Sequence, residues 1–301
     1  MVDAFEGAAG RQYAGFRRNH AKGICITGRF YSNGNGTVLS RAAFLRAGRF
    51  DVLGRFSVSG GNPSVNDNQV SMRSLALALD KGDEHWRMAM NSIPVFPVRT
   101  PEALLAQLKA SLPGQGDRAE RLHQFRLEHP EVQAFEDWSV AHPPSSGFDN
   151  AQYFSVSSFR FMDEDGHQRY VRWRLQPQAA YAPVSAEQRA QNDPDGLFHA
   201  LVSQLAAGPM RWNLILTVAL PGDAVNDATQ QWIQPGHQEI DAGVLVIDKQ
   251  QSQIDGPCRD VDFNPLMLPT GITPSDDPLL KARSAAYGES YVRRLWEQSA
   301  Q

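Results

Sequence analysis

The chain has 301 residues, of which 42% are hydrophobic and 21% are charged, and its formal net charge is −4. This length and composition are typical of a globular protein with a sizeable core, and no basic cluster is long enough to predict a nucleic-acid partner. The longest apolar runs, such as residues 214–220, have the length of a strand, so the sequence excludes a membrane-spanning helix of about eighteen apolar residues.

Eight segments have the β-branched or alternating pattern of strands, bounded by glycine and other turn residues. They are residues 23–31, 54–59, 75–79, 87–90, 157–162, 170–175, 212–220 and 243–248. Between the fifth and the sixth, the Asp-Glu-Asp-Gly sequence at 163–166 predicts a hairpin loop. These strands predict an antiparallel barrel over about residues 20–250, because a closed barrel leaves no sheet edge exposed.

Helices are expected between and after the strands, at residues 101–111, 118–128, from 130 onward, 195–206 and 277–296. Pro101 stands in the first turn of the first helix, where its missing N–H costs nothing. Residues 195–206 place their apolar side chains on one side. The predicted fold class is α+β, an eight-stranded antiparallel β-barrel with flanking helices. We expect one domain over residues 1–301, with its last helix at about 277–298.

The two cysteines, Cys25 and Cys258, share no metal-ligand spacing and are expected to be simple buried residues. A disulfide framework is therefore not expected as the source of stability. No leader peptide is recognised, although the residues after Met1 read like the middle of a sequence. The expected location is the periplasm if a leader was removed from the native chain, and the cytoplasm otherwise.

Two places in the sequence hold side chains that could take part in catalysis or cofactor binding. His20 stands just before a predicted strand, where a single histidine is more often structural or exposed. Arg283 and Tyr287 are four residues apart on a predicted helix and so share one face. The arginine would stabilise the tyrosine phenolate, which can hold ferric haem iron. On spacing alone, an arginine packed along a tyrosine ring at the surface is the simpler interpretation.

Four motifs, in order along nearly the whole chain, carry a resemblance to the haem catalases. Residues 17–23, Arg-Arg-Asn-His-Ala-Lys-Gly, resemble the distal histidine motif of that family. Residues 55–57 resemble its Arg-Phe-Ser motif, and residues 91–96 resemble its distal asparagine motif. Residues 277–287 resemble its proximal signature, and Arg294 falls where the family has a further arginine near the haem. The chain is most similar to the small catalase-related peroxidases, also called minimal catalases.

The resemblance implies haem b, with ferric iron, as the cofactor. Tyr287 is implied as the proximal iron ligand, kept ionised by Arg283. His20 would accept a proton from the bound peroxide and return it to the departing oxygen. Ser57 would orient the imidazole, and Asn91 would donate a hydrogen bond to the peroxide.

Three further arginines, Arg17, Arg55 and Arg294, are implied as partners of the haem propionates, for which arginine suits better than lysine. Phe96 would pack against the haem or the distal cavity, and a plain core aromatic explains it equally well.

The sequence departs from the larger catalases in three respects. Only nineteen residues precede His20 and fourteen follow Tyr287, so we expect no C-terminal flavodoxin-like domain, an accessible haem, and a monomer or homodimer. Asn19 replaces the apolar residue that precedes the distal histidine. Ser71 replaces an acidic residue of the access channel.

The implied function is that of a haem peroxidase. It would reduce hydrogen peroxide and organic hydroperoxides through an oxyferryl state, with a small organic electron donor and no nucleic-acid or membrane partner. Three alternatives stay open, since one scaffold can host several chemistries. They are the dismutation of hydrogen peroxide by a true catalase, a donor-independent rearrangement of fatty hydroperoxides, and haem binding without turnover.

Overall fold

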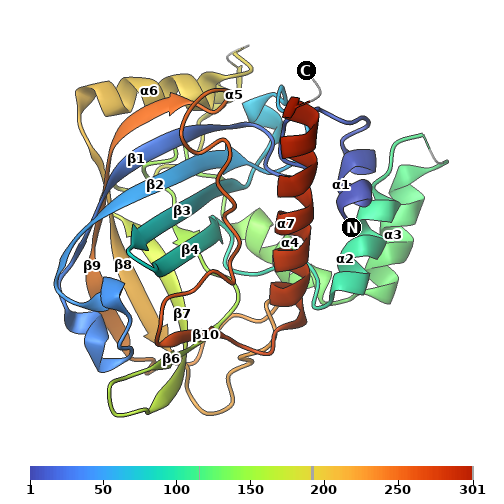
Figure 1. The fold of residues 1–301 in the computed structure, drawn as a ribbon. Helices are drawn as coiled ribbons and strands as arrows, with labels where there is room; N and C mark the ends of the chain where they lie inside the picture. Colours follow the sequence, from blue (N-terminus) through green and yellow to red (C-terminus); the bar gives the residue numbers. More distant parts are fainter. Residues whose placement is uncertain (115, 191–192, 300–301) are drawn as a thin grey trace.

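Eight strands form a closed antiparallel ring in the order β7-β5-β4-β3-β2-β1-β9-β8, and the pairing of β7 with β8 closes it (Figure 1). This is a computed structural model, which describes residues 1–114, 116–190 and 193–299. The ring strands are β1 (Gly23–Ser32), β2 (Gly48–Val58), β3 (Arg73–Lys81), β4 (Glu84–Asn91), β5 (Tyr153–Phe154), β7 (Gln168–Pro177), β8 (Met210–Val218) and β9 (Glu239–Ser252). The predicted barrel and the α+β class are confirmed.

One strand of the ring differs from the prediction. The segment predicted as a strand at 157–162 is only partly extended, as β6 (Phe159–Met162), and it pairs with the first half of β7. The ring position between β4 and β7 belongs instead to β5. Between β5 and β6 the extended conformation is interrupted at Val156. Its φ is 62°, which is an outlier for a β-branched residue. Beside this interruption the Ser155 hydroxyl accepts a hydrogen bond from the Trp173 N–H of β7 at 3.2 Å.

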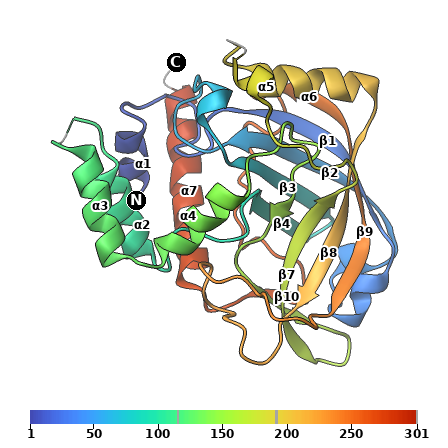
Figure 2. The ribbon, with the colours of Figure 1, turned by 180° about the vertical axis from the view of Figure 1, so that it is seen from behind.

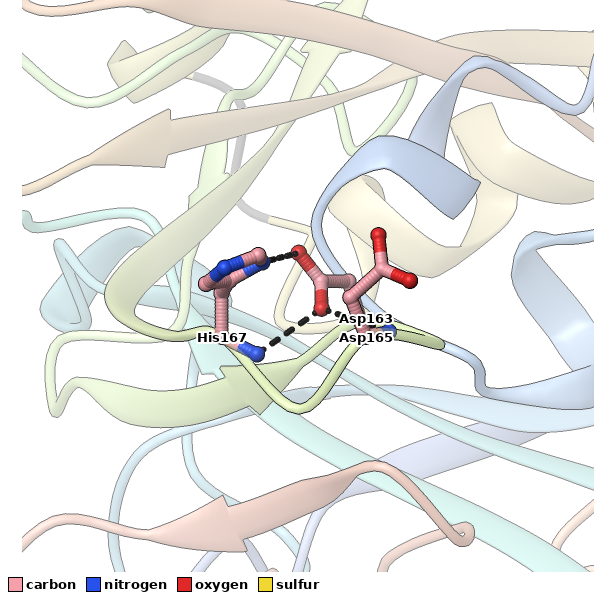
Figure 3. A group of neighbouring side chains, drawn as sticks. All are labelled: Asp163, Asp165 and His167. Atoms are coloured by element: carbon pink, nitrogen blue, oxygen red, sulfur yellow. Dashed lines mark hydrogen bonds and ion pairs between the residues drawn. The ribbon is translucent and has the colours of Figure 1, made fainter.

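The predicted hairpin loop at 163–166 is confirmed between β6 and β7. Figure 3 shows how the Asp163 carboxylate holds it together. One carboxylate oxygen accepts the backbone N–H groups of Asp165 and His167, at 3.0 and 2.9 Å, and the other lies 3.4 Å from the Arg169 guanidinium. These contacts occupy the Asp163 oxygens, so the group of Asp163 with the exposed Asp165 and His167 is a turn motif, and no metal is needed to explain it.

Large aromatic side chains fill the inside of the barrel. Phe56 stacks on Phe148 at 4.9 Å between ring centroids and lies 5.8 Å from Trp212. Side chains alternate along a strand, so burying Phe56 inside turns its neighbours Arg55 and Ser57 to the outer face. Because the interior is a packed core, the polar side chains that can do chemistry are on the outside of the barrel wall.

The helices cover that outer wall and one end of the barrel (Figures 1 and 2). Helix α7 (Pro278–Ser299) runs beside β1–β4, and α1 (Val2–Ala8), α2 (Pro101–Ala110) and α3 (Arg118–Glu128) pack beyond it. The remaining helices are α4 (Val132–Ala141), α5 (Ala186–Ala190), α6 (Gly196–Ala207) and three 3-10 turns at Asn35–Val38, Ala43–Leu45 and Asp67–Gln69. The sequence did not predict α1, α5, the short β10 (Ile272–Pro274) or these turns.

The predicted starts of α2 and α3 coincide with capping side chains. Thr100 accepts the Ala103 N–H at the start of α2, and Asp117 accepts the Ala119 N–H at the start of α3. These caps satisfy backbone donors that a helix leaves free at its first turn. Among the helices that the structure describes, none is both long and apolar enough to cross a membrane.

Candidate active site

A cavity lies between the outer face of β2–β4 and helix α7. Its lining includes all nine residues that the sequence singled out, namely Arg17, His20, Arg55, Ser57, Asn91, Phe96, Arg283, Tyr287 and Arg294. These residues come from the segment before β1, from β2 and β4, from the loop after β4, and from α7. The fold therefore brings the two ends of the chain to one place, which local sequence patterns alone do not require.

His20 occupies a strained turn immediately before β1. Its φ is 57°, in the left-handed region that residues other than glycine seldom adopt. The Asn19 side chain holds this turn, because its oxygen accepts the N–H groups of His20, at 2.9 Å, and of Gly60, at 2.8 Å. Such strain persists where surrounding contacts fix it, and it is concentrated at functional sites. Asn19, one of the departures from the larger catalases, thus fixes the direction of the histidine.

The surroundings of His20 keep its imidazole neutral. Burial, followed by the positive charges of Arg55, Arg283 and Arg17, lowers the pKa of His20 to about 3. Its Nδ1 is buried and makes no hydrogen bond within the described part of the chain. Ser57 lines the same cavity, but no hydrogen bond joins its hydroxyl to His20 in the described residues. The orienting role of Ser57 therefore stays a prediction.

Asn91 ends β4 directly opposite Ser74 of β3. The Ser74 hydroxyl donates a hydrogen bond to the Asn91 side-chain oxygen at 2.8 Å. This contact commits the amide oxygen and leaves the amide N–H groups to donate into the cavity. The sequence analysis missed Ser74. The register of the β3–β4 hairpin, counted back from its tight turn, is the signal that would have found it.

Three buried arginines in the cavity lack an adequate anionic partner. Burial, with repulsion from neighbouring arginines, lowers the pKa of Arg17 and of Arg294, and lowers the pKa of Arg55 to about 9. The Nε atoms of Arg55 and Arg294 are buried without a hydrogen-bond partner. Asp262 is the one carboxylate in the described lining, and burial raises its pKa. Arginines outnumber the single carboxylate in this lining, and this excess of positive charge suits the anionic propionates of a haem.

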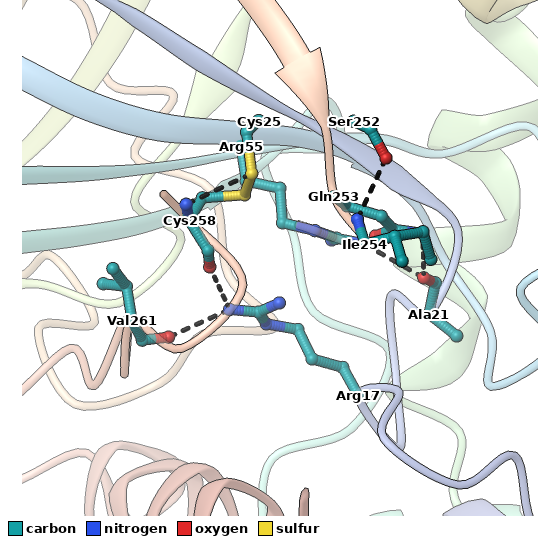
Figure 4. Close-up of a disulfide and its surroundings, with 9 residues drawn as sticks. All are labelled: Arg17, Ala21, Cys25, Arg55, Ser252, Gln253, Ile254, Cys258 and Val261. Atoms are coloured by element: carbon teal, nitrogen blue, oxygen red, sulfur yellow. Dashed lines mark hydrogen bonds between the residues drawn. A yellow bond between two sulfur atoms is a disulfide. The ribbon is translucent and has the colours of Figure 1, made fainter. Parts of the chain in front are cut away.

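Two of these arginines are fixed by backbone carbonyls. Arg17 donates to the carbonyl oxygens of Cys258, at 3.0 Å, and Val261, at 2.9 Å (Figure 4). Arg55 donates to the Ala21 carbonyl at 3.0 Å and to the side chain of Gln253. Both contacts place the long loop after β9 against the cavity.

Gly23 is required where Arg55 crosses β1. A Cβ atom at Gly23 would lie 2.4 Å from the central carbon of the Arg55 guanidinium, closer than real atoms approach. The glycine that closes the histidine motif thus provides the space in which the arginine packs.

A disulfide joins Cys25 of β1 to Cys258 of the same loop (Figure 4). The prediction that both cysteines are simple buried residues, with no disulfide, was wrong. The partners lie 233 positions apart, and sequence spacing cannot show that two distant cysteines meet in space. The Cys258 N–H also donates to the Cys25 sulfur at 3.2 Å. The crosslink fixes the loop whose carbonyls hold Arg17.

Replacing both cysteines with serine is expected to lower the free energy of unfolding by about 2–5 kcal/mol, because the crosslink no longer restricts the unfolded chain. Urea unfolding of the two proteins measures the difference. The control is a thiol titration of the denatured, unreduced wild-type protein, which should show no free thiol. Two free thiols together with equal stabilities would contradict the pairing.

Tyr287 and Arg283 lie one turn apart on α7. Arg283 donates to the Ala89 carbonyl of β4 at 3.0 Å, which ties the helix to the barrel wall. Tyr287 packs against the apolar cluster that contains the disulfide and Phe263. The helix start is fixed by Asp277, whose carboxylate accepts the Leu279 N–H at 2.9 Å. Tyr287 and Arg283 both line the cavity, and a tyrosine oxygen is a ligand that suits ferric haem iron.

Phe96 lines the cavity from the loop after β4. Its backbone N–H donates to the Ala228 carbonyl at 2.8 Å, and its ring is partly buried between two apolar clusters. The ring therefore has one face on the core and another toward the cavity, as both sequence interpretations allow.

Comparison with known proteins agrees with this geometry. The family model described as Catalase matches residues 11–301, and the chain belongs to the catalase family. It is 30% identical to a catalase-related peroxidase of Synechococcus elongatus, over 98% of this chain and 87% of the relative. It is also 30% identical to a catalase-related peroxidase of Mycolicibacterium paratuberculosis, over 97% of this chain and 93% of the relative. The family implies a haem cofactor.

Solved catalase structures share the fold. A fungal catalase superposes with a TM-score of 0.85 at 20% identity, and catalase A from Saccharomyces cerevisiae with a TM-score of 0.84 at 20% identity. Each match covers 95% of this chain but only 60% and 62% of the catalases. The chain thus spans about three fifths of the length of these catalases.

Proposed function

We propose that this protein is a haem-dependent peroxidase that reduces hydrogen peroxide and organic hydroperoxides with a small organic electron donor. One observation carries the proposal. A group of buried arginines with unpartnered Nε atoms shares a cavity with a phenol and with an imidazole that is held neutral. The similarity of the chain to two catalase-related peroxidases supports it.

The proposed cofactor is haem b with ferric iron, which when bound supplies the redox chemistry that splits the peroxide O–O bond. The Tyr287 oxygen would hold the metal, and Arg283 would stabilise the negative charge on that oxygen. Arg17, Arg55 and Arg294 would bind the two propionates. Phe96 would pack against the macrocycle or the distal cavity.

The proposed chemistry of the chain is a proton transfer. The neutral His20 ring accepts the peroxide proton and returns it to the departing oxygen, so that water or an alcohol leaves. Asn91, whose amide oxygen is held by Ser74, donates a hydrogen bond that polarises the peroxide. Asn19 holds the left-handed turn that aims the imidazole. Ser57 is proposed to orient the ring.

The rate of reaction with hydrogen peroxide is expected to be nearly independent of pH between about pH 5 and 8, the range in which an ordinary histidine titrates. Burial is the largest cause of the lowered pKa of His20, so the ring can accept a proton throughout this range, and the rate falls only at lower pH. Stopped-flow mixing with hydrogen peroxide at a series of pH values measures this. A wild-type rate that halves near the usual histidine pKa would contradict it.

The function is tested by giving the haem-loaded protein hydrogen peroxide with and without guaiacol, while oxygen release and guaiacol oxidation are recorded together. We expect guaiacol oxidation to account for the peroxide consumed, with little oxygen. Rapid, sustained oxygen release from peroxide alone would establish dismutation and overturn the peroxidase assignment. Consumption of a fatty hydroperoxide without any donor would establish the rearrangement instead.

An oxidising compartment is the proposed location, which for a bacterial chain means the periplasm. The Cys25–Cys258 disulfide supports this, because such crosslinks persist in oxidising compartments and are rare in the cytosol. Trapping the thiol state with an alkylating agent in the native cell tests it. Two alkylated cysteines would overturn the proposal.

A further inference from the structure

A second cavity, of about 320 Å³, lies against the first. The two share a wall. Ser92 and Ile93 line the second cavity and directly follow Asn91, which lines the first. Phe154 lines the second cavity, pairs with Asn91 across β4 and β5, and packs in one cluster with Phe96 of the first. The two cavities are therefore neighbours along the end of β4 and the loop after it.

The second cavity is aromatic and uncharged. Trp138 stacks on His142 with 4.3 Å between ring centroids, at the end of α4. Tyr181 donates its hydroxyl hydrogen bond to the Pro143 carbonyl and is 55% exposed, so the cavity has a mouth at the surface. No aspartate, glutamate, lysine or arginine is part of its described lining. The volume is at the lower end of the range for small-molecule sites.

Its polar side chains are amides, four serine hydroxyls and the His142 imidazole rather than acids, lysines or arginines. The side chains of Gln152 and Gln176 are bonded to each other at 2.7 Å within the lining. An amide pair of this kind can offer one donor and one acceptor to a hydroxyl group without attracting an ion. Flat aromatic walls with a few neutral polar groups favour a neutral aromatic ligand over a charged one.

We propose that this cavity binds the electron donor, and that the donor is a neutral phenol. The inference rests on the proposed function. Two phenols each give up one electron and one proton to become phenoxyl radicals, while the peroxide O–O bond breaks and its two oxygens leave as one water and one alcohol, or as two waters. A donor bound here lies next to the cavity of the proposed haem, to which its electrons would pass.

Ala179 lines the cavity at an exposed position, and its neighbour Ala180 is also exposed but outside the described lining, so the two residues give a matched pair of variants. For Ala179→Trp we expect the KM for guaiacol to rise about tenfold, the equivalent of losing about 1.4 kcal/mol of binding. The KM for hydrogen peroxide, and turnover with ferrocyanide as an anionic donor, should match the wild type. Ala180→Trp should behave as the wild type in every assay.

Calorimetric titration of guaiacol into the resting, haem-loaded proteins gives a readout apart from turnover. We expect its Kd to weaken about tenfold in Ala179→Trp and to be unchanged in Ala180→Trp. Equal guaiacol Kd and KM in both variants would overturn the proposal. A rise in the KM for cumene hydroperoxide instead would also overturn it, because the cavity would then hold the aryl group of the peroxide. Failure of the proposed function would show as no oxidation of either donor by any variant, and calorimetry would still decide whether the cavity binds a phenol.

Discussion

Tyr287→Phe is expected to weaken haem binding by more than about 100-fold, because even the loss of a group that only supports a metal ligand costs about 10–100-fold. The substitution removes one hydroxyl group and keeps the ring that packs beside the disulfide and Phe263, so the fold should persist. Titration of the protein with ferric haem, followed by the Soret absorbance, measures the change in Kd.

Tyr291→Phe is the matched control for this variant. Tyr291 lies one turn further along α7, where it packs against Arg294, and it is outside the described cavity lining. It should leave the haem Kd unchanged. Equal haem affinities for Tyr287→Phe and the wild type would show that the iron ligand is another residue.

His20→Ala is expected to slow the reaction with hydrogen peroxide by about 10²–10⁴-fold, the usual worth of a general acid–base group, while haem binding is retained. The physical reason is that the cavity offers no other neutral base in its described lining. Stopped-flow mixing of the haem-loaded variant with hydrogen peroxide measures the rate.

Two further variants distinguish the effect of losing the imidazole from the effect of disturbing the strained turn. Asparagine tolerates the left-handed conformation of His20 but does not accept a proton as a base, so His20→Asn should be as slow as His20→Ala. His199→Ala, at an exposed position of α6, should react as the wild type does. A normal rate in His20→Asn would assign the proton transfer to another group.

The regular elements could be predicted because their signals are local. Strand alternation identifies residues 170–175 within β7, and Pro101 marks the start of α2 where the structure has it. The candidate site could be identified because four motifs with fixed internal spacing occur in order, although periodicity alone left His20 and Tyr287 ambiguous.

The remaining features depend on contacts between distant segments. The break at Val156, which gives the eighth ring position to β5, has no local signature because tertiary packing imposes it. The Cys25–Cys258 crosslink needs a loop 233 positions away to return to β1. The Gln253 contact needs the same loop to reach Arg55 of β2, 198 positions away. In the sequence, Asn19 is recognisable only as a departure from the family. Its role follows from the left-handed backbone conformation of His20, which only the structure shows.

The crystal structure of the haem-loaded protein tests the central claim most directly. We expect the iron bonded to the Tyr287 oxygen, the propionates bound by Arg17, Arg55 and Arg294, and His20 on the opposite face of the macrocycle. Iron bound by another residue, or a haem outside the cavity between the barrel and α7, would contradict the account.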